Sequence, residues 1–356
     1  MTPTEVPEAE LEVDLGAILA NWRDLCARHG AAVAGVVKAD GYGLGAAPVA
    51  RALAGGGCRH FFVAQWAEGM ALRAALGDGP MIAVLGGFPP GADAGAGLTP
   101  VLNTPQDIAA WGNVAATPAG TILHLDTGME RLGLTRAERA ALAPGALDRL
   151  GLRYVMTHLA CADDPAHPLN ALQAARFAEA AGAFPGIPRS FANSAGLFLG
   201  PDFASALARP GCALYGINPT PGHPNPMRQV MRLTVPVLQV RRVAAGTPVG
   251  YGATWVAKRD SMVATIAAGY ADGYLRALSS QGTGIVAGRP VPLVGRVSMD
   301  LITLDVTDAP DLRPGDRVEM IGPSQTADEV AALAGTIGYE VLTSLGARYR
   351  RRYLPA

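Results

Sequence analysis

Short apolar runs alternate with longer stretches of helical period between residues 31 and 217. Eight runs occur, at residues 32–38, 60–65, 81–85, 99–103, 121–126, 153–158, 189–193 and 212–217. Between them, segments rich in Ala, Leu and Glu repeat apolar positions with the period of a helix, at residues 47–53, 67–75, 106–111 and 171–181. Several runs are almost wholly apolar, as in strands buried on both faces. Eight strand–helix units in series predict a closed parallel (β/α)8 barrel, an α/β fold of the TIM type.

The pattern changes after residue 228. Strand-like runs at residues 232–242, 262–268, 284–286, 292–306 and 317–321 are joined by Gly, Pro and Asp turns. One helix is expected at residues 327–334, with Thr326 as its N-cap. We therefore predict a barrel domain over residues 10–228 and a mainly β C-terminal domain over residues 229–356. Residues 1–9 are expected to pack with the second domain, and the prolines at 219–226 to form the connector.

Composition and charge narrow the class of protein. Hydrophobic residues make up 49% of the 356 residues and charged residues 17%, which suits a folded enzyme. The net charge of −1 gives no reason to expect nucleic acid or a membrane surface as a partner. The cysteines, Cys26, Cys58, Cys161 and Cys212, lack metal-site or disulfide spacing. The sequence also lacks signal-peptide features and any run of eighteen apolar residues, so we expect a cytoplasmic protein without a metal site.

Lys38 ends the first predicted strand and opens onto a glycine-rich loop. Burial at a strand end lowers the pKa of an amine, and a neutral amine can form a Schiff base with an aldehyde cofactor. A lysine that reaches from the strand end to solvent is the structural alternative. The spacing around Lys38 leaves both interpretations open, so the decision depends on the other strand ends.

Polar residues recur at the carboxyl ends of the later predicted strands. Asp126 and Arg131 follow the fifth strand, His158 ends the sixth, Asn193 and Ser194 end the seventh, and Arg209 with Gly211 precedes the eighth. Taken alone, His158 fits a core histidine and Arg209 an exposed surface arginine. Gathered on one rim, they lie where barrel enzymes build active sites. Ser194 and the backbone of Gly211 and Cys212 fall where this fold often binds phosphate.

Nine segments carry a family resemblance. They are VVKADGYG (36–43), HLDTGMERLG (124–133), MTHLACAD (156–163), FANSAG (191–196), RPGCALYG (209–216), GYGATW (250–255), GYADGYLR (269–276), VGRVSMD (294–300) and GYEVLTSLGARY (338–349). In this order the segments resemble the alanine racemases, two-domain barrel enzymes that use pyridoxal 5'-phosphate, over nearly the whole chain. The resemblance implies that alanine is interconverted between its L and D forms, which supplies D-alanine for peptidoglycan.

The resemblance also implies two catalytic residues. Lys38 would hold the cofactor covalently and act as the base on one face of the substrate α-carbon. Tyr251, supplied by a second subunit, would be the acid or base on the opposite face. Racemisation requires this arrangement, because one group removes the α-proton and another returns a proton from the other side. The implied assembly is a homodimer with shared active sites.

Further residues are assigned to the cofactor and the substrate by the same resemblance. Arg209 would face the pyridine nitrogen, His158 would lie against the ring, and Tyr42, Ser194, Gly211 and Cys212 would hold the phosphate, with Asn193 beside them. Arg131 would contact the phenolate oxygen of the cofactor and the substrate carboxylate, whereas Met299, Asp300, Tyr270 and Arg276 would form the pocket and its entrance. Packing or loop support is the alternative role for Tyr42, Met299 and Asp300.

Two positions depart from the family pattern. His124 stands where many members have a lysine that is modified to a carbamate and orients the arginine. Because histidine cannot form that carbamate, Arg131 is oriented by His124, by a bound anion or by water. Ala347 stands where many members place a tyrosine near the cofactor phosphate, which loosens the pocket and bears on specificity.

Three alternatives follow from these residues. A racemase of broader specificity on the same scaffold would accept serine or a basic amino acid. A non-catalytic barrel that binds the cofactor would have no use for the β domain that carries Tyr251. A decarboxylase of similar build is opposed by Arg209, because decarboxylation profits from a protonated ring nitrogen held by a carboxylate.

Overall fold

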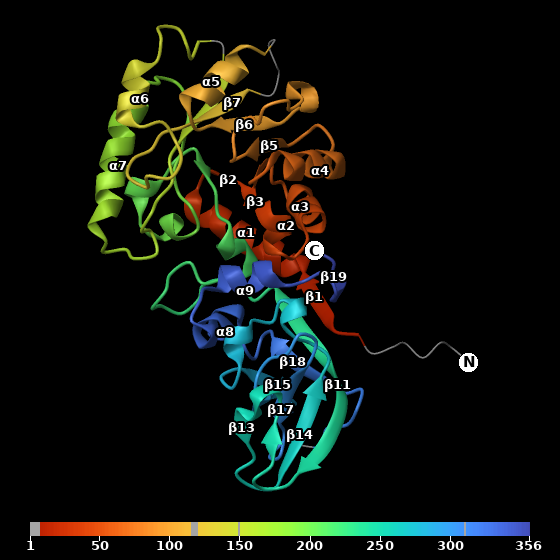
Figure 1. Cartoon of the computed structure of the whole chain (residues 1–356). Helices are drawn as coiled ribbons and strands as arrows, with labels where there is room; N and C mark the ends of the chain where they lie inside the picture. Colours follow the sequence, from red (N-terminus) through yellow and green to blue (C-terminus); the bar gives the residue numbers. More distant parts are fainter. Residues whose placement is uncertain (1–7, 115–119, 149, 310) are drawn as a thin grey trace. The chain divides into compact units, whose positions relative to one another are not determined.

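The computed structural model describes residues 8–114, 120–148, 150–309 and 311–356, and Figure 1 labels most of the helices and many of the strands. The chain divides into two compact units. The barrel unit is Gly16–Arg228, and the β unit combines the described residues up to Leu15 with Gln229–Ala356.

A parallel sheet forms the centre of the barrel unit. Its strands are β2 (Ala32–Val33), β3 (Gly35–Val36), β4 (His60–Val63), β5 (Met81–Val84), β6 (Thr99–Leu102), β7 (Thr121–His124), β8 (Leu152–Met156), β9 (Arg189–Ser190) and β10 (Leu207–Ala208). They pair in the order β2-β10-β9-β8-β7-β6-β5-β4-β3. Because only Ala34 separates β2 from β3, the two ends of this order meet and the sheet closes. The barrel predicted from the sequence is confirmed.

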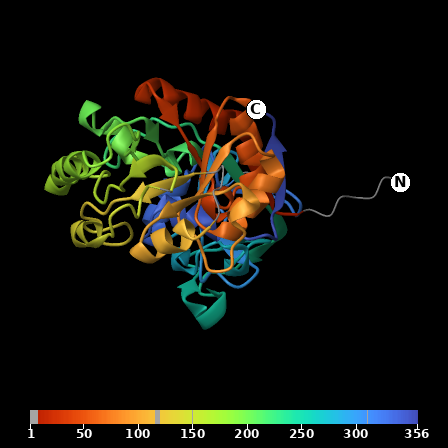
Figure 2. The ribbon, with the colours of Figure 1, turned by 90° about the horizontal axis from the view of Figure 1, so that it is seen from above.

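Helices surround these strands. They are α1 (Leu15–His29), α3 (Ala46–Gly55), α4 (Trp66–Leu76), α5 (Pro105–Gly112), α6 (Arg136–Ala141) and α7 (Pro168–Ala181), and they lie outside the barrel (Figure 2). The four predicted helical segments are among them. Local sequence sets several of their starts: Thr104 caps α5 by accepting a hydrogen bond from the Asp107 amide at 3.0 Å. Inward strand residues such as Phe62, Val101 and Met156 fill the barrel with one buried cluster.

The eighth strand differs from the sequence prediction. Its expected position at residues 212–217 is wrong, because the strand is β10 (Leu207–Ala208) and Cys212–Tyr215 form the 3-10 turn η4. The apolar segment is buried for another reason: Tyr215 stacks on Tyr42 and donates from its hydroxyl to the Val36 carbonyl at 3.0 Å. Short apolar runs fit either a strand or a buried turn. Arg209 therefore follows the eighth strand directly instead of introducing it.

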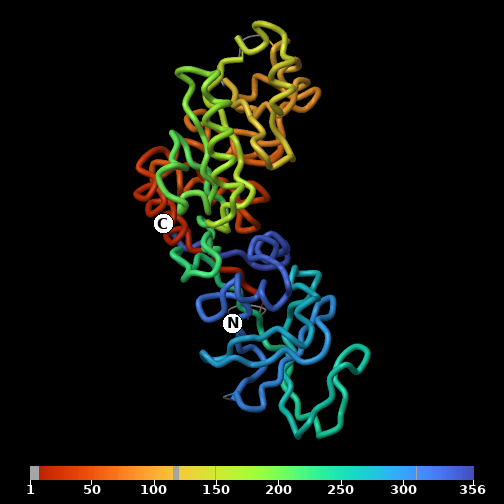
Figure 3. Tube along the Cα trace, turned by 90° about the vertical axis from the view of Figure 1, so that its left-hand side faces the viewer, coloured from red at the N-terminus to blue at the C-terminus, as the bar shows by residue number. Residues whose placement is uncertain are grey.

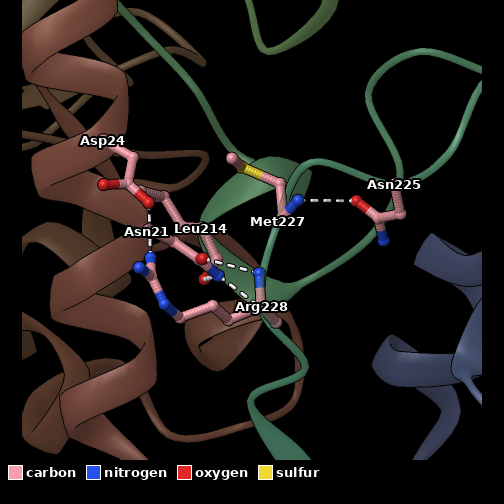
Figure 4. A network of polar contacts seen from close by, with 6 residues as sticks. All are labelled: Asn21, Asp24, Leu214, Asn225, Met227 and Arg228. Atoms are coloured by element: carbon pink, nitrogen blue, oxygen red, sulfur yellow. Dashed lines mark hydrogen bonds and ion pairs between the residues drawn. The ribbon is translucent and has the colours of Figure 1, made fainter.

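A buried side chain of α1 clamps the last residues of the barrel unit. Asn21 is fully buried and donates from Nδ2 to the carbonyls of Leu214 at 3.2 Å and Arg228 at 3.0 Å. Its Oδ1 accepts the Arg228 amide at 2.8 Å, and the Arg228 guanidinium pairs with Asp24 on the same helix (Figure 4). The proline-rich segment at residues 219–226 therefore ends at a fixed backbone position.

The β unit is built around one long strand. Its strands are β1 (Glu10–Asp14), β11 (Met231–Val243), β14 (Ser261–Ile266), β15 (Thr283–Val286), β16 (Arg289–Pro292), β17 (Ile302–Asp305), β18 (Arg317–Ile321) and β19 (Arg350–Leu354), with a separate hairpin of β12 (Pro248–Val249) and β13 (Trp255–Val256). The long strand β11 pairs with β1, β14 and β18. The mainly β architecture agrees with the prediction, and α8 (Ala327–Ala334) begins at the expected cap, Thr326.

Three details of the β unit depart from expectation. Residues 292–306 form a hairpin and not one strand, since Leu293 bridges Leu304 antiparallel and the Ser298 amide donates to the Leu301 carbonyl at 3.1 Å. A second helix, α9 (Gly338–Ser344), follows α8. Strand β1 pairs with β11 and β19, so residues 10–14 belong with the β unit and not with the barrel, because their backbone hydrogen bonds are made there.

None of the helices in the described ranges has both the length and the apolar character needed to cross a membrane.

Candidate active site

Lys38 lies at the carboxyl end of β3 and begins the short helical turn α2 (Lys38–Tyr42). The preceding residue, Val37, is anchored because its amide donates to the Phe62 carbonyl at 2.9 Å. Burial lowers the pKa of the Lys38 amine, the positive charge of Arg131 acts in the same direction, and Glu68 opposes them. A larger share of neutral amine is therefore present than for a lysine in water.

The turn after Lys38 is left-handed. Ala39, Asp40, Gly41 and Tyr42 have φ angles of 52°, 51°, 63° and 55°. For residues other than glycine this conformation costs about 1–2 kcal/mol each. Two carboxylates hold it: Glu68 on α4 accepts the Ala39 amide at 2.7 Å, and Asp40 accepts the Ala46 amide at 2.8 Å. The strained backbone fixes the direction in which Lys38 leaves the strand.

Arg209 is a buried cation at the end of β10, only 4% exposed. Its guanidinium donates to Ser190 Oγ at 2.6 Å and to the Thr157 carbonyl at 2.6 Å. It also lies over the Phe62 ring, 5.9 Å from the centroid. Burial lowers its pKa to about 10, which leaves it protonated at neutral pH. Within the described ranges no carboxylate forms an ion pair with Arg209, so its charge is available to an anion or an aromatic nitrogen.

His158 stands beside Arg209, whose Nη2 lies 3.5 Å from His158 Nδ1. Burial is the main reason that the pKa of His158 falls well below its usual value, and the positive charges of Arg209 and Arg131 add to it. The loop that carries His158 is held by Gln173 on α7. Fully buried, Gln173 donates to the His158 carbonyl at 2.9 Å and to Thr127 Oγ1 at 3.2 Å, which ties the loops after β7 and β8 together.

The phosphate-binding candidates gather between β9 and η4. Ser194 Oγ accepts the amides of Gly211 at 2.9 Å and Ala213 at 3.3 Å. A Cβ at Gly211 would lie 2.1 Å from the Tyr42 hydroxyl, so only glycine fits there. Cys212 is buried and begins η4. The hydroxyls of Ser194 and Tyr42 and the backbone of Gly211 thus lie together on the rim, and they are groups of the kind that bind anions.

Asn193 has a different place. Its Oδ1 accepts the Gly196 amide at 2.8 Å, and its Nδ2 donates to the Leu159 carbonyl at 3.4 Å. The amide of Asn193 therefore holds the backbone that presents Ser194.

His124 ends β7 and faces the same rim. Its Nδ1 lies 2.8 Å from Oδ1 of Asn103, a residue that follows β6. Burial and the charge of Arg209 lower the pKa of His124 to about 4. Arg131 lies on the loop after β7, which Asp126 organises by accepting the amides of Gly128 at 2.9 Å and Met129 at 3.0 Å. The Arg131 side chain is exposed.

The remaining candidates belong to the β unit. Tyr251 begins the short turn η5 between β12 and β13 and is 72% exposed. This segment, teal in Figure 3, projects from its sheet. Tyr251 lines an open pocket of about 820 Å³ together with Arg296. A Cβ at Gly252 would lie 3.1 Å from Nη1 of Arg296, which places a cation directly beside the Tyr251 turn.

Tyr270 and Met299 are held together by backbone hydrogen bonds. The Tyr270 amide donates to the Ser298 carbonyl at 3.0 Å, and the Ala271 amide donates to the Met299 carbonyl at 3.0 Å. Both side chains are exposed, Tyr270 by 42% and Met299 by 54%.

Asp300 is paired with Arg348 at 2.8 Å, and Arg348 also contacts the buried Asp272 at 3.1 Å. Ala347, next to Arg348, and Arg276, at the start of η7, are exposed. The sequence candidates thus form two sets, one at the barrel mouth and one on an exposed face of the β unit.

Sequence reasoning missed several supporting residues. Asn103 ends the fourth predicted strand, so the strand-end pattern could have identified it. Glu68 and Gln173 lie on helices and Arg296 in a loop, where no local pattern marks them. Their roles come from hydrogen bonds or contacts with residues distant in the sequence.

The barrel mouth brings Lys38, His124, Arg131, His158 and Arg209 together, as their mutual effects on pKa require. Burial favours the neutral form of Lys38 and of both histidines, whereas Arg209 stays charged. The described residues contain no group of three or more side chains suited to a metal. This combination indicates a class: barrel enzymes that use a lysine as nucleophile and bind an organic anion at the barrel mouth.

Comparison with known proteins gives the family. The family models for the N-terminal and C-terminal domains of alanine racemase match residues 13–219 and 230–353. The alanine racemase of Acidiphilium cryptum is 54% identical over 96% of this chain and 97% of its own length. A catabolic alanine racemase of Mesorhizobium japonicum is 50% identical over 97% of this chain and 93% of its own. The chain belongs to the alanine racemase family.

A solved structure supports the same assignment. Alanine racemase from Bartonella henselae, crystallised with covalently bound pyridoxal phosphate, has a TM-score of 0.93 and 42% identity, covering 98% of this chain and all of that one. The resemblance found in the sequence is therefore confirmed.

Proposed function

We propose that this protein interconverts L- and D-alanine with pyridoxal 5'-phosphate, using Lys38 and Tyr251 as the two proton-transfer groups. Family membership supports the reaction, and the chemistry of the barrel mouth supports the roles of the residues. The observation that carries the proposal is Arg209, a buried guanidinium hydrogen-bonded to neutral acceptors at the rim that also holds Lys38.

The residues of the barrel mouth fit the cofactor. Glycine at position 211 lets the Tyr42 hydroxyl lie against the backbone, because any Cβ would be 2.1 Å from that hydroxyl. Tyr42, Ser194, Gly211 and Cys212 would hold the phosphate, Asn193 would support that loop, and His158 and Arg209 would lie along the ring. When bound, pyridoxal phosphate stabilises negative charge that develops on the α-carbon of an amino acid.

Lys38 both attaches the cofactor and moves a proton. The sequence contains one other lysine, Lys258, which is exposed in the β unit. Lys38 differs because burial favours its neutral form, and only a neutral amine can attack a carbonyl or accept the α-proton. The left-handed turn and Glu68 fix the backbone from which Nζ must reach the substrate.

Tyr251 would serve the opposite face of the α-carbon from a second subunit. Its exposed position on a projecting turn suits a residue that completes another surface. A homodimer with shared active sites follows from this assignment.

Arg131 would bind the substrate carboxylate. The substrate pocket would be lined by Met299, Asp300 and Tyr270 of the second subunit. Asp300 shares Arg348 with Asp272, so the pairing offsets part of its negative charge and weakens its repulsion of a substrate carboxylate. An arginine at the ring nitrogen disfavours a decarboxylase, because it cannot readily give up a proton to that nitrogen.

The four cysteines are free, which suits a reducing cytoplasm, where D-alanine would supply peptidoglycan synthesis.

The test is exchange of the α-proton in deuterium oxide for a panel of L-amino acids, with chiral analysis of the products. Fast exchange of alanine alone, with both enantiomers formed, is the expected result. Exchange of serine or basic amino acids at similar rates would support an amino-acid racemase and reject its specificity for alanine. Loss of carboxylate as carbon dioxide without racemisation would reject the racemase assignment.

A further inference from the structure

Asn103 has only one possible amide orientation. Its Nδ2 donates to the carbonyls of Leu85 and Val101, both at 2.9 Å, which uses both N–H groups. The reverse orientation would set Oδ1 against two carbonyl oxygens. Oδ1 therefore faces His124 Nδ1 at 2.8 Å, and Asn103 is 3% exposed. Because this oxygen only accepts, the hydrogen-bond network assigns the His124 proton to Nδ1.

A neutral His124 then carries a lone pair on Nε2. The charged or titratable groups that act on it are Arg209 after β10, Asp126 and Arg131 after β7, and His158 after β8. Burial and the two arginines keep the pKa of His124 near 4, and only Asp126 opposes them. At neutral pH Nε2 of the neutral imidazole is thus a hydrogen-bond acceptor close to the positive charges of Arg209 and Arg131.

The loop of Arg131 passes beside the His124 ring. A Cβ at Gly133 would lie 3.0 Å from His124 Cδ2 and 3.1 Å from His124 Cγ. The loop returns to β7 because the Leu134 amide donates to the His124 carbonyl at 2.8 Å. Arg209 is already committed to Ser190 and Thr157. Arg131 makes no hydrogen bond or ion pair with the described part of the chain, so its guanidinium is the available donor.

We propose that His124 is a positioning residue for Arg131: with its Nδ1–H held by Asn103, it accepts a hydrogen bond at Nε2 from the Arg131 guanidinium when an amino acid is bound. The proposal rests on the function proposed above. A neutral acceptor directs Arg131 without cancelling its charge, so the full positive charge remains for the substrate carboxylate.

The first test is nuclear magnetic resonance of the holoenzyme with 15N-labelled histidine, using His124→Gln to assign the signal. We expect a neutral ring with a protonated Nδ1 at pH 7. A proton on Nε2, or a charged ring at neutral pH, would overturn the proposal. This measurement does not depend on racemase activity, so it decides the His124 assignment even if the alanine reaction is not found.

The second test separates positioning from stability. His124→Leu should raise the KM for alanine about tenfold, the value of one hydrogen bond, with a smaller change in kcat. His124→Gln, which keeps a donor and an acceptor, should restore most of the KM. An unchanged KM in His124→Leu with normal cofactor absorbance would overturn the proposal.

Asn103→Asp keeps the test decisive if the leucine variant does not fold. A carboxylate facing Nδ1 should stabilise the charged imidazole and raise the pKa of His124. The KM for alanine should then rise as the pH falls through that pKa, because the protonated Nε2 repels Arg131. A KM with the same pH profile as the wild type, despite a raised His124 pKa, would reject the role in positioning Arg131.

Discussion

The two halves of the candidate site are built in opposite ways. At the barrel mouth, Arg209, Ser194 and His124 are 4%, 5% and 7% exposed, and each makes hydrogen bonds within its own unit. On the β unit, Tyr251 is 72% exposed and Met299 is 54% exposed. Buried polar groups need partners inside the fold, whereas exposed aromatic and apolar groups gain by being covered. The barrel half is therefore organised by contacts within its own unit, whereas the β half presents exposed side chains that the proposed second subunit would cover.

The largest effect is expected at the barrel half. Lys38→Ala should remove the absorbance of the covalently held cofactor and lower racemisation by at least about a thousandfold, because both nucleophile and base are lost. Lys258→Ala is the matched control, since it removes the only other lysine, and it should behave as the wild type. Retained absorbance in Lys38→Ala would mean that the wrong lysine was assigned.

Removal of the Tyr251 hydroxyl tests whether the β half of the site transfers a proton. Tyr251→Phe should keep cofactor binding, which belongs to the barrel, and reduce racemisation about 10²–10⁴-fold, because one face of the α-carbon lacks its proton carrier. Tyr339→Phe, at a partly exposed tyrosine on α9, should leave the rate unchanged. If Tyr251→Phe racemised alanine as fast as the wild type in both directions, this tyrosine would have no part in the mechanism.

Mixing the two inactive variants asks whether the halves come from different subunits. A hybrid dimer of Lys38→Ala and Tyr251→Phe subunits contains one intact site, so random reassociation should recover about a quarter of wild-type activity. If both groups acted within one subunit, mixing would recover nothing. Dilution followed by sedimentation supplies the check, because isolated wild-type monomers should be inactive.

A smaller effect concerns the buried polar groups of the rim. The pKa of His124 is about 4 in the folded protein against 6.5 for a free histidine. The unfolded chain therefore takes up a proton first as the pH falls, and stability that is fully present above pH 6.5 declines towards pH 4, by up to about 3 kcal/mol. Urea denaturation of wild type and His124→Gln across this range should show a steeper decline in the wild type, because His158 loses stability in both proteins and His124 only in the wild type; parallel curves would contradict the prediction.

The smallest effect is expected where the barrel unit ends. Asn21→Ala removes three hydrogen bonds and leaves the backbone of Leu214, which is buried, and that of Arg228 with fewer partners, which should cost about 1–3 kcal/mol of unfolding free energy. Activity per folded molecule should not change, because Asn21 lies outside the site. Asn113→Ala, at an exposed helix end, is the control and should have no measurable effect on denaturation.

Much of the barrel half could be predicted from the sequence. Strand periodicity and strand ends are local properties, so they located Lys38, His158 and Ser194 on one rim before any contact was known. The same reasoning misplaced the eighth strand, because the apolar run 212–217 is buried under its neighbours without joining the sheet.

Only the tertiary structure decided how these residues are held and charged. Asn103 fixes the His124 proton from 21 positions away, Gln173 joins two loops from a helix, and Asn21 clamps Arg228 across 207 positions. The pattern of apolar and polar positions determined which residues reach the rim, because strands and helices are specified largely by residues close together in the sequence. Their partners, burial and pKa values depend on contacts between distant segments, which exist only once the barrel has closed.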